Sequence, residues 1–350
     1  MFVRLESLTY AAAFVAYNCP MRMVSLDVLR ERAAGKAEPL LRSLAAERWI
    51  SRDSALKWGA IAGIALADLA LCARQELTFA PANLVLPVVW LTLLGIPALY
   101  YYRRGEDRFV LCLATLAQTI AFISSFTVLM YAVASFSRPL CDDQLAAFDA
   151  WCGVNVSAIR DWTNAHAAVR LAMDAAYGLL LFQLPTIVIV LGLLGDRRPL
   201  ETFVLQEIVA SLLTVAVFAF LPADGPFSFH GYDPSPDQAH YLEHFRGIRS
   251  GEMQSISLQG AAGLVTFPSF HTAEALLMAL AFRRRRSLFV LFGSLNLLVV
   301  LSTMTTGWHY FADVVAGLVV GGVSFWAVQA CSPWIYGDGL RNTNRWFKPS

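Results

Sequence analysis

Long apolar runs separated by short polar segments set the pattern of this chain. Eight runs stand out, and each predicts a membrane-spanning helix: residues 55–73, 83–102, 108–136, 168–195, 201–221, 270–283, 287–305 and 308–331. A helix of about 20 apolar residues matches the hydrocarbon thickness of a bilayer. The sixth run is short, although Phe267 to Phe270 could lengthen it. The pattern therefore predicts an all-α integral membrane protein with about eight transmembrane helices.

Composition agrees with this prediction. Only 15% of the 350 residues are charged, whereas a soluble domain carries about 25%. The formal net charge of +1 indicates no nucleic-acid partner. Arginines outnumber lysines by 24 to three, a bias associated with GC-rich bacteria. We therefore expect a multi-pass protein of a bacterial inner membrane.

Basic residues near the ends of the runs predict the orientation, because they concentrate in cytoplasmic connections. The N-terminal region 1–54 and the tail 332–350 are expected on the cytoplasmic side. The alternate connections with the arginine clusters fall on the same side: Arg103, Arg104 and Arg108, then Arg197 and Arg198, then Arg283 to Arg286. His271 and His309 then face the opposite side, which is the periplasm in a bacterium.

Cys141 and Cys152 share one polar connection on that outer side. An oxidising compartment permits a disulfide between them, which would stabilise the fold by roughly 3 kcal/mol. Alternatively, Leu145, Phe148 and Cys152 fit the apolar face of an interfacial helix. The sequence leaves both interpretations open.

A histidine and an aspartate stand four residues apart at the start of the last run, in GWHYFAD. On a helix, His309 and Asp313 would share one face within hydrogen-bonding reach. The aspartate could then fix the imidazole tautomer and leave the other ring nitrogen free to attack or to take a proton. The helix N-terminus at this point would also favour an anion.

A second histidine opens the sixth run, in FPSFHT. His271 follows Pro268 and Ser269, whose backbone and hydroxyl could meet a phosphate, and Thr272 is a further candidate for substrate contact. A displacement at phosphorus needs a nucleophile and an acid for the leaving oxygen, and two separate histidines could fill these roles. Arg246 and Arg249 in the preceding connection could clamp a phosphate.

These residues also admit other interpretations. A histidine can be a donor in helix packing, and a His–Asp pair can be purely structural. Intramembrane Asp and His also occur in transporters, although broken helices and inverted repeats are not clear in this sequence. A non-catalytic lipid-binding or scaffold protein is a further alternative.

FPSFHT and GWHYFAD resemble the second and third signature motifs of the type-2 phosphatidic acid phosphatase superfamily. More closely, they resemble the branch that includes inositol phosphorylceramide synthase. The similarity covers about residues 108–331, a six-helix phosphatase-like core and the expected catalytic membrane domain. Residues 55–107 would be two additional transmembrane helices. The resemblance implies that His309 is the nucleophile, Asp313 its orienting partner, His271 the general acid and Ser269 a phosphate ligand, with no metal or cofactor.

Two departures from the phosphatase pattern bear on the reaction. Thr303 stands where that pattern has a phosphate-binding arginine, and the first phosphatase motif is absent. In its place, LPADGPFSF is similar to the proline-rich element of the inositol phosphorylceramide synthase branch. Arg249, and after it Arg246, are then the candidates to bind the phosphate. We expect a lipid phosphotransferase with an alcohol acceptor; the alternative is a lipid phosphatase, in which water is the acceptor.

Two more polar groups have open assignments. Asp174 and Tyr177, with Gln183, lie in the fourth run, where they could line a head-group cavity or satisfy one another in the bundle. His240 and His244 could bind a metal with Asp237 or Glu243, but a solvated helix in the connection is the favoured interpretation.

Overall fold

The computed structural model describes residues 52–79 and 81–336. The predicted N-terminal region 1–54 and tail 332–350 therefore lie largely outside the described residues. The described part of both segments, residues 52–54 and 332–336, belongs to helices.

Every one of the eight apolar runs forms a helix. These helices are α4 (Arg52–Arg74), α5 (Val85–Arg103), α6 (Asp107–Ala134), α9 (Ala167–Leu193), α10 (Arg197–Phe218), α13 (Phe270–Ala281), α14 (Arg286–Thr305) and α15 (Phe311–Tyr336). In the described residues, seven helices are long and apolar enough to cross a membrane. Helix α13 has only 12 residues, and it begins at Phe270 with Ser269 as its N-cap, so the residues before it do not lengthen it. The predicted all-α membrane fold is confirmed.

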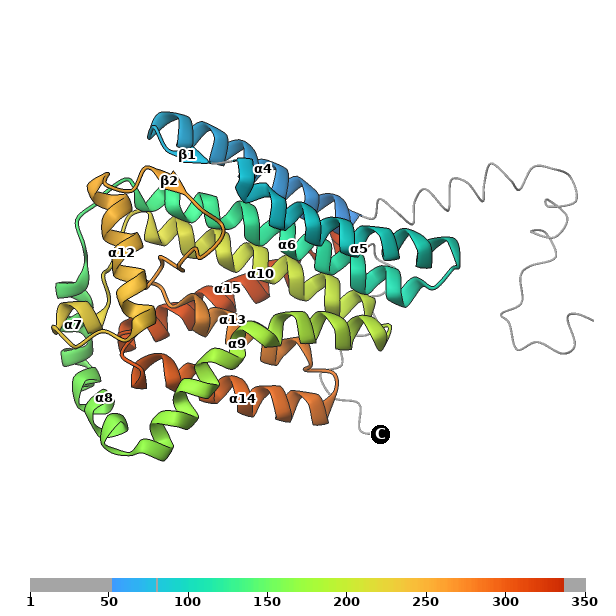
Figure 1. Ribbon diagram of the computed structural model, residues 1–350. Coiled ribbons are helices and arrows are strands. Elements are labelled where there is room, and N and C mark those ends of the chain that lie inside the picture. Colours follow the sequence, from blue (N-terminus) through green and yellow to red (C-terminus); the bar gives the residue numbers. More distant parts are fainter. Residues whose placement is uncertain (1–51, 80, 337–350) are drawn as a thin grey trace, which may run out of the picture. The chain divides into compact units, whose positions relative to one another are not determined.

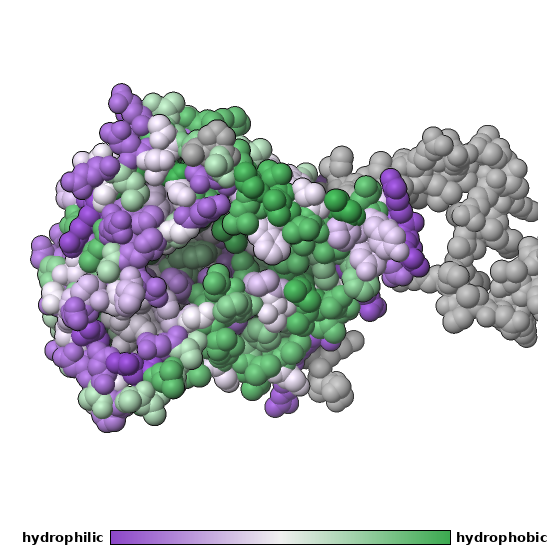
Figure 2. All heavy atoms as spheres, viewed as in Figure 1, coloured by the Kyte–Doolittle hydropathy of each residue, from purple (hydrophilic) through white to green (hydrophobic). Residues whose placement is uncertain are grey.

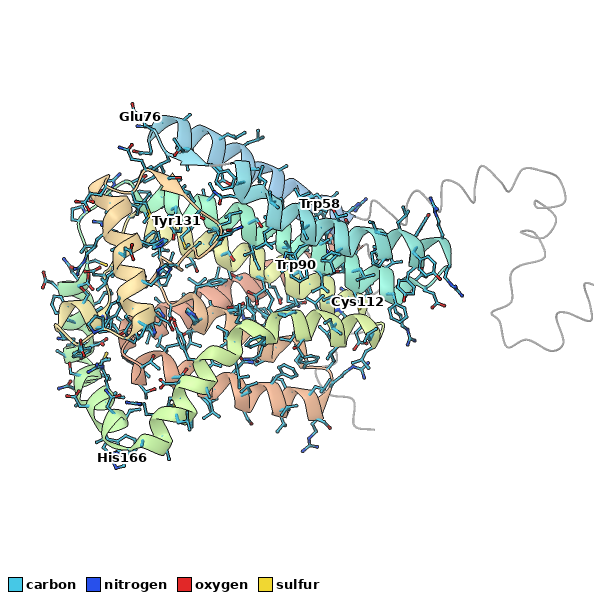
Figure 3. All side chains as sticks on the ribbon, viewed as in Figure 1. Trp58, Glu76, Trp90, Cys112, Tyr131 and His166 are labelled. Carbon is cyan, nitrogen blue, oxygen red and sulfur yellow. The ribbon has the colours of Figure 1, made fainter. Side chains whose placement is uncertain are left out.

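The outer face of the helices is apolar. Leu66, Leu93 and Leu181 are more than half exposed, and Trp58 and Trp90 on α4 and α5 are about half exposed (Figure 3). Figure 2 shows a hydrophobic belt between two more hydrophilic ends. Lipid tails can solvate such a belt, and helices suit it because they satisfy their backbone polar groups internally.

Helix α10 is the central helix of the bundle. Of its apolar stretch, 72% is buried, whereas only 11% of the corresponding stretch around α5 is buried. It packs against α6, α9, α13 and α15, and α14 packs on α9 and α13 (Figure 1). Leu200, Phe203 and Phe218 are among its fully buried side chains. The core therefore lies along α10, and α5 lies at the periphery.

Short elements gather at one end of the bundle, which we call the hydrophilic end. They are α7 (Asp142–Trp151), α8 (Val156–Ala165), α11 (Pro226–Phe229), α12 (Pro236–Ser250), the 3-10 helix η1 (Pro81–Leu84) and the strands β1 (Thr78–Phe79) and β2 (Ser255–Ile256) (Figure 1). Glu76 and His166 mark this end in Figure 3. The strands pair in parallel, with Thr78 opposite Ser255.

The two cysteines of the connection before α9 are free. Cys141 is buried at the start of α7, where its thiol donates to the Leu221 carbonyl at 3.5 Å, and Cys152 is exposed at the other end of that helix. The structure therefore favours the interfacial helix over the disulfide. Of the predicted apolar face, Leu145 is buried, whereas Phe148 and Cys152 are exposed.

Candidate active site

The N-termini of α13 and α15 meet because α15 carries glycines where α13 crosses it. A Cβ at Gly317 would lie 2.4 Å from the Ser269 carbonyl oxygen, and one at Gly321 would lie 3.0 Å from that of Ala273. The Ser269 N–H donates to the Asp313 carbonyl at 3.1 Å. This close approach brings the rings of His271 and His309 to a centroid distance of 5.7 Å. The two motifs predicted to act together are therefore adjacent.

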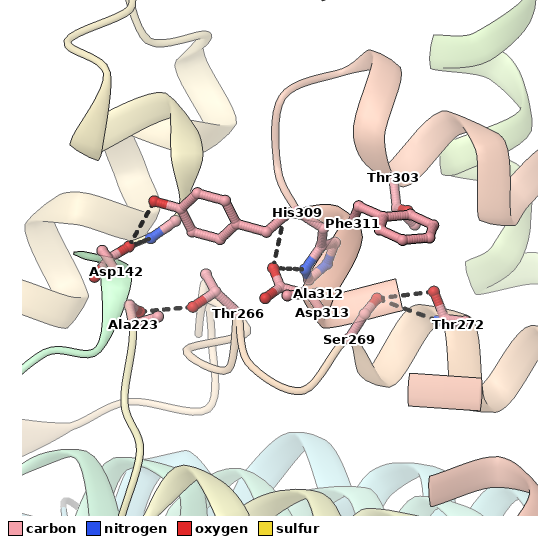
Figure 4. Close-up of polar contacts among 12 residues, drawn as sticks. Asp142, Ala223, Thr266, Ser269, Thr272, Thr303, His309, Phe311, Ala312 and Asp313 are labelled. Atoms are coloured by element: carbon pink, nitrogen blue, oxygen red, sulfur yellow. Dashed lines mark hydrogen bonds and ion pairs between the residues drawn. The ribbon is translucent and has the colours of Figure 1, made fainter. Parts of the chain in front are cut away.

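His309 lies in the short connection between α14 and α15 and is only 2% exposed. Its Nδ1 is 3.2 Å from Oδ2 of Asp313, and its backbone N–H donates to the Thr303 carbonyl at 3.1 Å. Oδ2 of Asp313 also accepts the Tyr310 N–H at 2.8 Å. Figure 4 shows His309 held between these partners. Thr303, at the position of the missing arginine, is thus a buried backbone support for His309.

Helix α7 contributes two buried carboxylates to the base of this site. Asp149 accepts the N–H groups of Phe311 and Ala312 at 2.9 and 2.8 Å, which caps α15 from another element. Asp142 accepts the N–H groups of Asp224 and Gly225, both at 2.9 Å, and the Tyr310 hydroxyl at 3.1 Å (Figure 4). The N-terminal N–H groups of α15, expected to attract a phosphate, are therefore taken by Asp149 and Asp313.

Burial controls the protonation of His309. It lowers the pKa of the imidazole to about 4, while a backbone hydrogen bond with Thr266 acts in the opposite direction. The ring is therefore neutral at pH 7. When Nδ1–H donates to Asp313, Nε2 carries the free lone pair, so the arrangement can act as a nucleophile or a base.

A cavity of about 240 Å³ opens onto both histidines. Tyr177 of α9 stacks on His271 at a centroid distance of 4.7 Å, and Trp308 lies parallel to Tyr177 at 6.2 Å. The surface is hollowed at the edge of the hydrophobic belt (Figure 2). The lining residues are Tyr177, Asp237, His240, Tyr241, Ala262, Gly263, Val265, Thr266, His271, Trp308 and His309.

The remaining predicted phosphate ligands lie away from this cavity. The Ser269 hydroxyl accepts the N–H and the hydroxyl of Thr272 at 3.3 and 3.1 Å, and both residues are fully buried at the start of α13. Arg246 donates to Asp224 and Ser228, at 2.8 and 2.7 Å. Arg249 donates to the Arg138 carbonyl at 2.6 Å. None of these four predicted ligands lines the cavity.

The three polar residues of α9 have different surroundings. Tyr177 lines the cavity, as the head-group interpretation expects, but Asp174 is exposed and is not part of the lining. Gln183 accepts a hydrogen bond from Asn296 at 2.9 Å. The three residues therefore neither form one cavity wall nor satisfy one another.

His240 and His244 lie on α12, and each has a hydrogen-bond partner. His240 Nε2 is 2.7 Å from the Gly260 carbonyl oxygen, and His244 Nδ1 is 2.5 Å from the Tyr131 hydroxyl. Burial lowers the pKa of His244, and nearby His240 lowers it further. Within the described residues, no cluster of three metal-binding side chains is found.

Sequence reasoning missed several residues of the site. Asp142 and Asp149 lie seven positions apart in a polar connection, a spacing that puts them on one face of a helix and is the signal that could have found them. No spacing pattern marks Trp308 or Tyr241, because the sequence of an aromatic-rich chain does not distinguish aromatic residues at the cavity from those elsewhere.

Comparison with known proteins places this site in a family. The family model described as PAP2 superfamily matches residues 143–327, more than half of the chain. The chain belongs to the PAP2 superfamily. Members of this superfamily are phosphatases or phosphotransferases. In this PAP2 protein, the matched segment runs from α7 into α15 and contains both histidines and Asp313, whereas α4, α5 and α6 precede it. No curated protein and no solved structure matches the chain.

Proposed function

We propose that this PAP2 protein is a membrane phosphotransferase that acts on a phospholipid-type substrate through a phosphohistidine intermediate. The observation that carries the proposal is the buried His309–Asp313 pair, which faces a cavity shared with His271. The neutral imidazole and its carboxylate partner supply an activated nucleophile. The neighbouring histidine supplies the proton transfers that the two halves of such a reaction require.

The first half of the proposed reaction transfers the phosphorylated head group to the protein. Nε2 of His309 attacks the phosphorus, and the bond from phosphorus to the lipid alcohol breaks as the N–P bond forms. His271 gives its proton to the departing oxygen. Asp313 keeps the proton on Nδ1 and stabilises the positive charge that develops on the attacking ring.

The second half releases the group to an acceptor. His271, now neutral, takes the proton of the acceptor hydroxyl, whose oxygen attacks phosphorus while the N–P bond breaks. With a phosphodiester lipid, an alcohol acceptor gives a new phosphodiester and water gives a free phosphomonoester; with a lipid phosphate, water gives inorganic phosphate. Transfer to an alcohol is favoured by the resemblance of LPADGPFSF to the inositol phosphorylceramide synthase branch, and hydrolysis by water is the second candidate.

The orientation and location complete the proposal. The concentration of arginines in the connections at the other end supports an orientation in which the hydrophilic end, with both histidines, lies on the outer side of the membrane. We therefore propose that the protein acts at the outer leaflet of a bacterial inner membrane. A C-terminal tag should be protected from protease in sealed cells, while the connection around residue 240 should be accessible. The reverse pattern would contradict this orientation.

The test of function compares purified wild type with His309→Ala. Both are incubated with a panel of labelled phospholipids and lipid phosphates, with and without alcohol acceptors, and products and the His309 peptide are analysed by mass spectrometry. We expect wild type alone to move label to an acceptor and to carry the group on His309. Release of free phosphate without transfer would favour the phosphatase, and full turnover by His309→Ala would exclude the nucleophile assignment.

A further inference from the structure

The cavity wall has an unusual charge balance for a phosphate site. Among the described lining residues there is neither Lys nor Arg, and the lining carries one carboxylate, that of Asp237. The nearby arginines are held elsewhere: Arg246 by Asp224 and Arg249 by the Arg138 carbonyl. Arg160, which packs beside Gly307, stacks on the Tyr232 ring at 4.1 Å. A phosphomonoester dianion would therefore meet a like charge without a compensating cation.

Aromatic rings cover the part of the cavity near Asp237. Tyr177 and Trp308 are parallel to within 2°, and Tyr241 stands at 89° to Trp308 with a centroid distance of 5.8 Å. Asp237 is close enough to Tyr177 to act on it electrostatically. Aromatic faces attract organic cations within about 6 Å of the ring centroid, and a carboxylate adds to that attraction. This part of the cavity thus favours a positive group.

His271 and His309 adjoin these rings, since Tyr177 stacks on His271 at a centroid distance of 4.7 Å. An imidazole can donate a hydrogen bond to a phosphate oxygen in either protonation state, and it lacks the permanent charge of an arginine. The cavity volume of about 240 Å³ is below the ~300–1,000 Å³ of most ligand sites, so it suits a head group rather than a whole lipid. The two histidines suit a phosphate, and the adjoining rings with Asp237 suit a cation.

We propose that the substrate is a zwitterionic phosphodiester lipid, with its phosphate between His271 and His309 and its ammonium group against Asp237 and the rings of Tyr177, Tyr241 and Trp308. This rests on the proposed function and deepens it. The head group stays in the cavity as the covalent intermediate forms. A phosphodiester anion and an ammonium cation together match a lining with one carboxylate and no fixed cation.

The experiment uses the full-length protein and lipids with identical acyl chains. Head-group transfer or release is measured for phosphatidylcholine, phosphatidylethanolamine, phosphatidylglycerol and phosphatidate, with wild type, Asp237→Asn and Asp233→Asn. Asp233 is exposed, lies in the same connection and is not part of the cavity lining, so its variant controls for the loss of a surface charge. The two zwitterionic lipids distinguish a trimethylammonium from a primary ammonium group.

We expect kcat/KM for one or both zwitterionic lipids to exceed that for the anionic lipids at least tenfold. Asp237→Asn should raise KM for the zwitterionic lipid about tenfold, the equivalent of 1.4 kcal/mol, and should leave or improve the use of anionic lipids. Asp233→Asn should resemble wild type. Equal use of phosphatidylglycerol or phosphatidate by wild type would overturn the head-group proposal, as would equal losses for all lipids in Asp237→Asn.

A binding measurement separates this proposal from the proposed function. Dihexanoyl phosphatidylcholine and dihexanoyl phosphatidate are titrated into the His309→Ala variant, with and without Asp237→Asn, by calorimetry. Selective binding of the zwitterionic lipid that depends on Asp237 would support the head-group proposal, with or without turnover by wild type. Absence of turnover by wild type, together with such binding, would overturn the proposed function and leave the head-group proposal intact. Label on His309 from an anionic lipid, with no selective binding, would keep the proposed function and overturn the head-group assignment.

Discussion

His309 combines two features that usually oppose each other. It is almost completely buried, which disfavours its charged form, and it is bonded to a carboxylate, which favours that form. Burial dominates, since the pKa of the ring is lowered to about 4. The residue therefore keeps a free lone pair at neutral pH, and Asp313 would stabilise the charge that develops on the ring in the proposed reaction.

This balance predicts the pH dependence of the first half-reaction. Protonation removes the lone pair of His309, so the rate of phosphoenzyme formation falls as the pH drops through the pKa of that ring. Because this pKa is about 4, protonation of His309 should not lower the rate between pH 7 and pH 5.5, whereas a free imidazole, which titrates near pH 6.5, would lose its lone pair across this range. Single-turnover rates across this range check the prediction, with circular dichroism to confirm that the protein stays folded.

Residue-level chemistry was predictable where it depends on local spacing. The four-residue spacing of His309 and Asp313 requires only a helix to bring them together. The roles of Arg246 and Ser269 could not be predicted in this way, because Asp224 and Thr272 are bonded to them instead of a phosphate. The sequence shows that a guanidinium and a hydroxyl are present at these positions, but not which neighbouring side chains form hydrogen bonds with them.

At the scale of elements, α7 acts as a brace for the start of α15. Its buried carboxylates hold the chain on both sides of the site: Asp142 binds the Asp224–Gly225 backbone and the Tyr310 hydroxyl, and Asp149 binds the first N–H groups of α15. Hydropathy located the membrane helices to within a few residues. Hydropathy could not locate this brace, because α7 is short and polar; the seven-residue spacing of Asp142 and Asp149 indicates a shared helix face but not the helix N-terminus that this face contacts.

Loss of the brace should affect both stability and turnover. Asp149→Ala leaves two N–H groups of α15 without acceptors, so we expect a loss of about 1–2 kcal/mol in stability, as for other lost caps, and a lower kcat. Asp143→Ala removes an exposed carboxylate from the same helix and should have little effect. Thermal unfolding and steady-state kinetics of both variants provide the test. Unchanged turnover in Asp149→Ala would show that the cap is dispensable for the site.

The crossing of α13 and α15 yields a second prediction at this scale. Gly317→Ala would place a Cβ 2.4 Å from the Ser269 carbonyl oxygen, so the helices must separate, at a cost of about 1–3 kcal/mol. We expect His271 to move away from His309 and kcat to fall. In Gly322→Ala the new Cβ meets nothing within 4 Å, and activity should persist. Equal activity of the two variants would contradict the proposed role of the crossing.

At the scale of the whole described region, the segment that contains α4 and η1 is bonded to the rest of the bundle at two places. Lys57 on α4 pairs with Glu201 on the central helix α10, within the buried part of the bundle. At the hydrophilic end, Thr78 donates to the Gln254 carbonyl at 2.8 Å, and Asn83 donates to that of Ile256 at 2.9 Å. The apolar runs predicted α4 and α5. They did not predict the ion pair and hydrogen bonds described above, because these depend on which segments of the chain lie together in space.

The bond from Asn83 to Ile256 has a mechanical consequence. The chain that continues from Ile256 supplies Ala262, Gly263, Val265 and Thr266 to the cavity wall, while the apolar stretch around α5 is the least buried of the candidate membrane spans in the described residues. A helix adjusts its tilt to bilayer thickness, at a cost of fractions of a kcal/mol per Å of mismatch. Turnover should therefore vary with the acyl-chain length of the surrounding lipid, and Asn83→Ala should weaken that dependence. Rates in nanodiscs of graded thickness would show whether the activity of this protein depends on the thickness of the membrane around it.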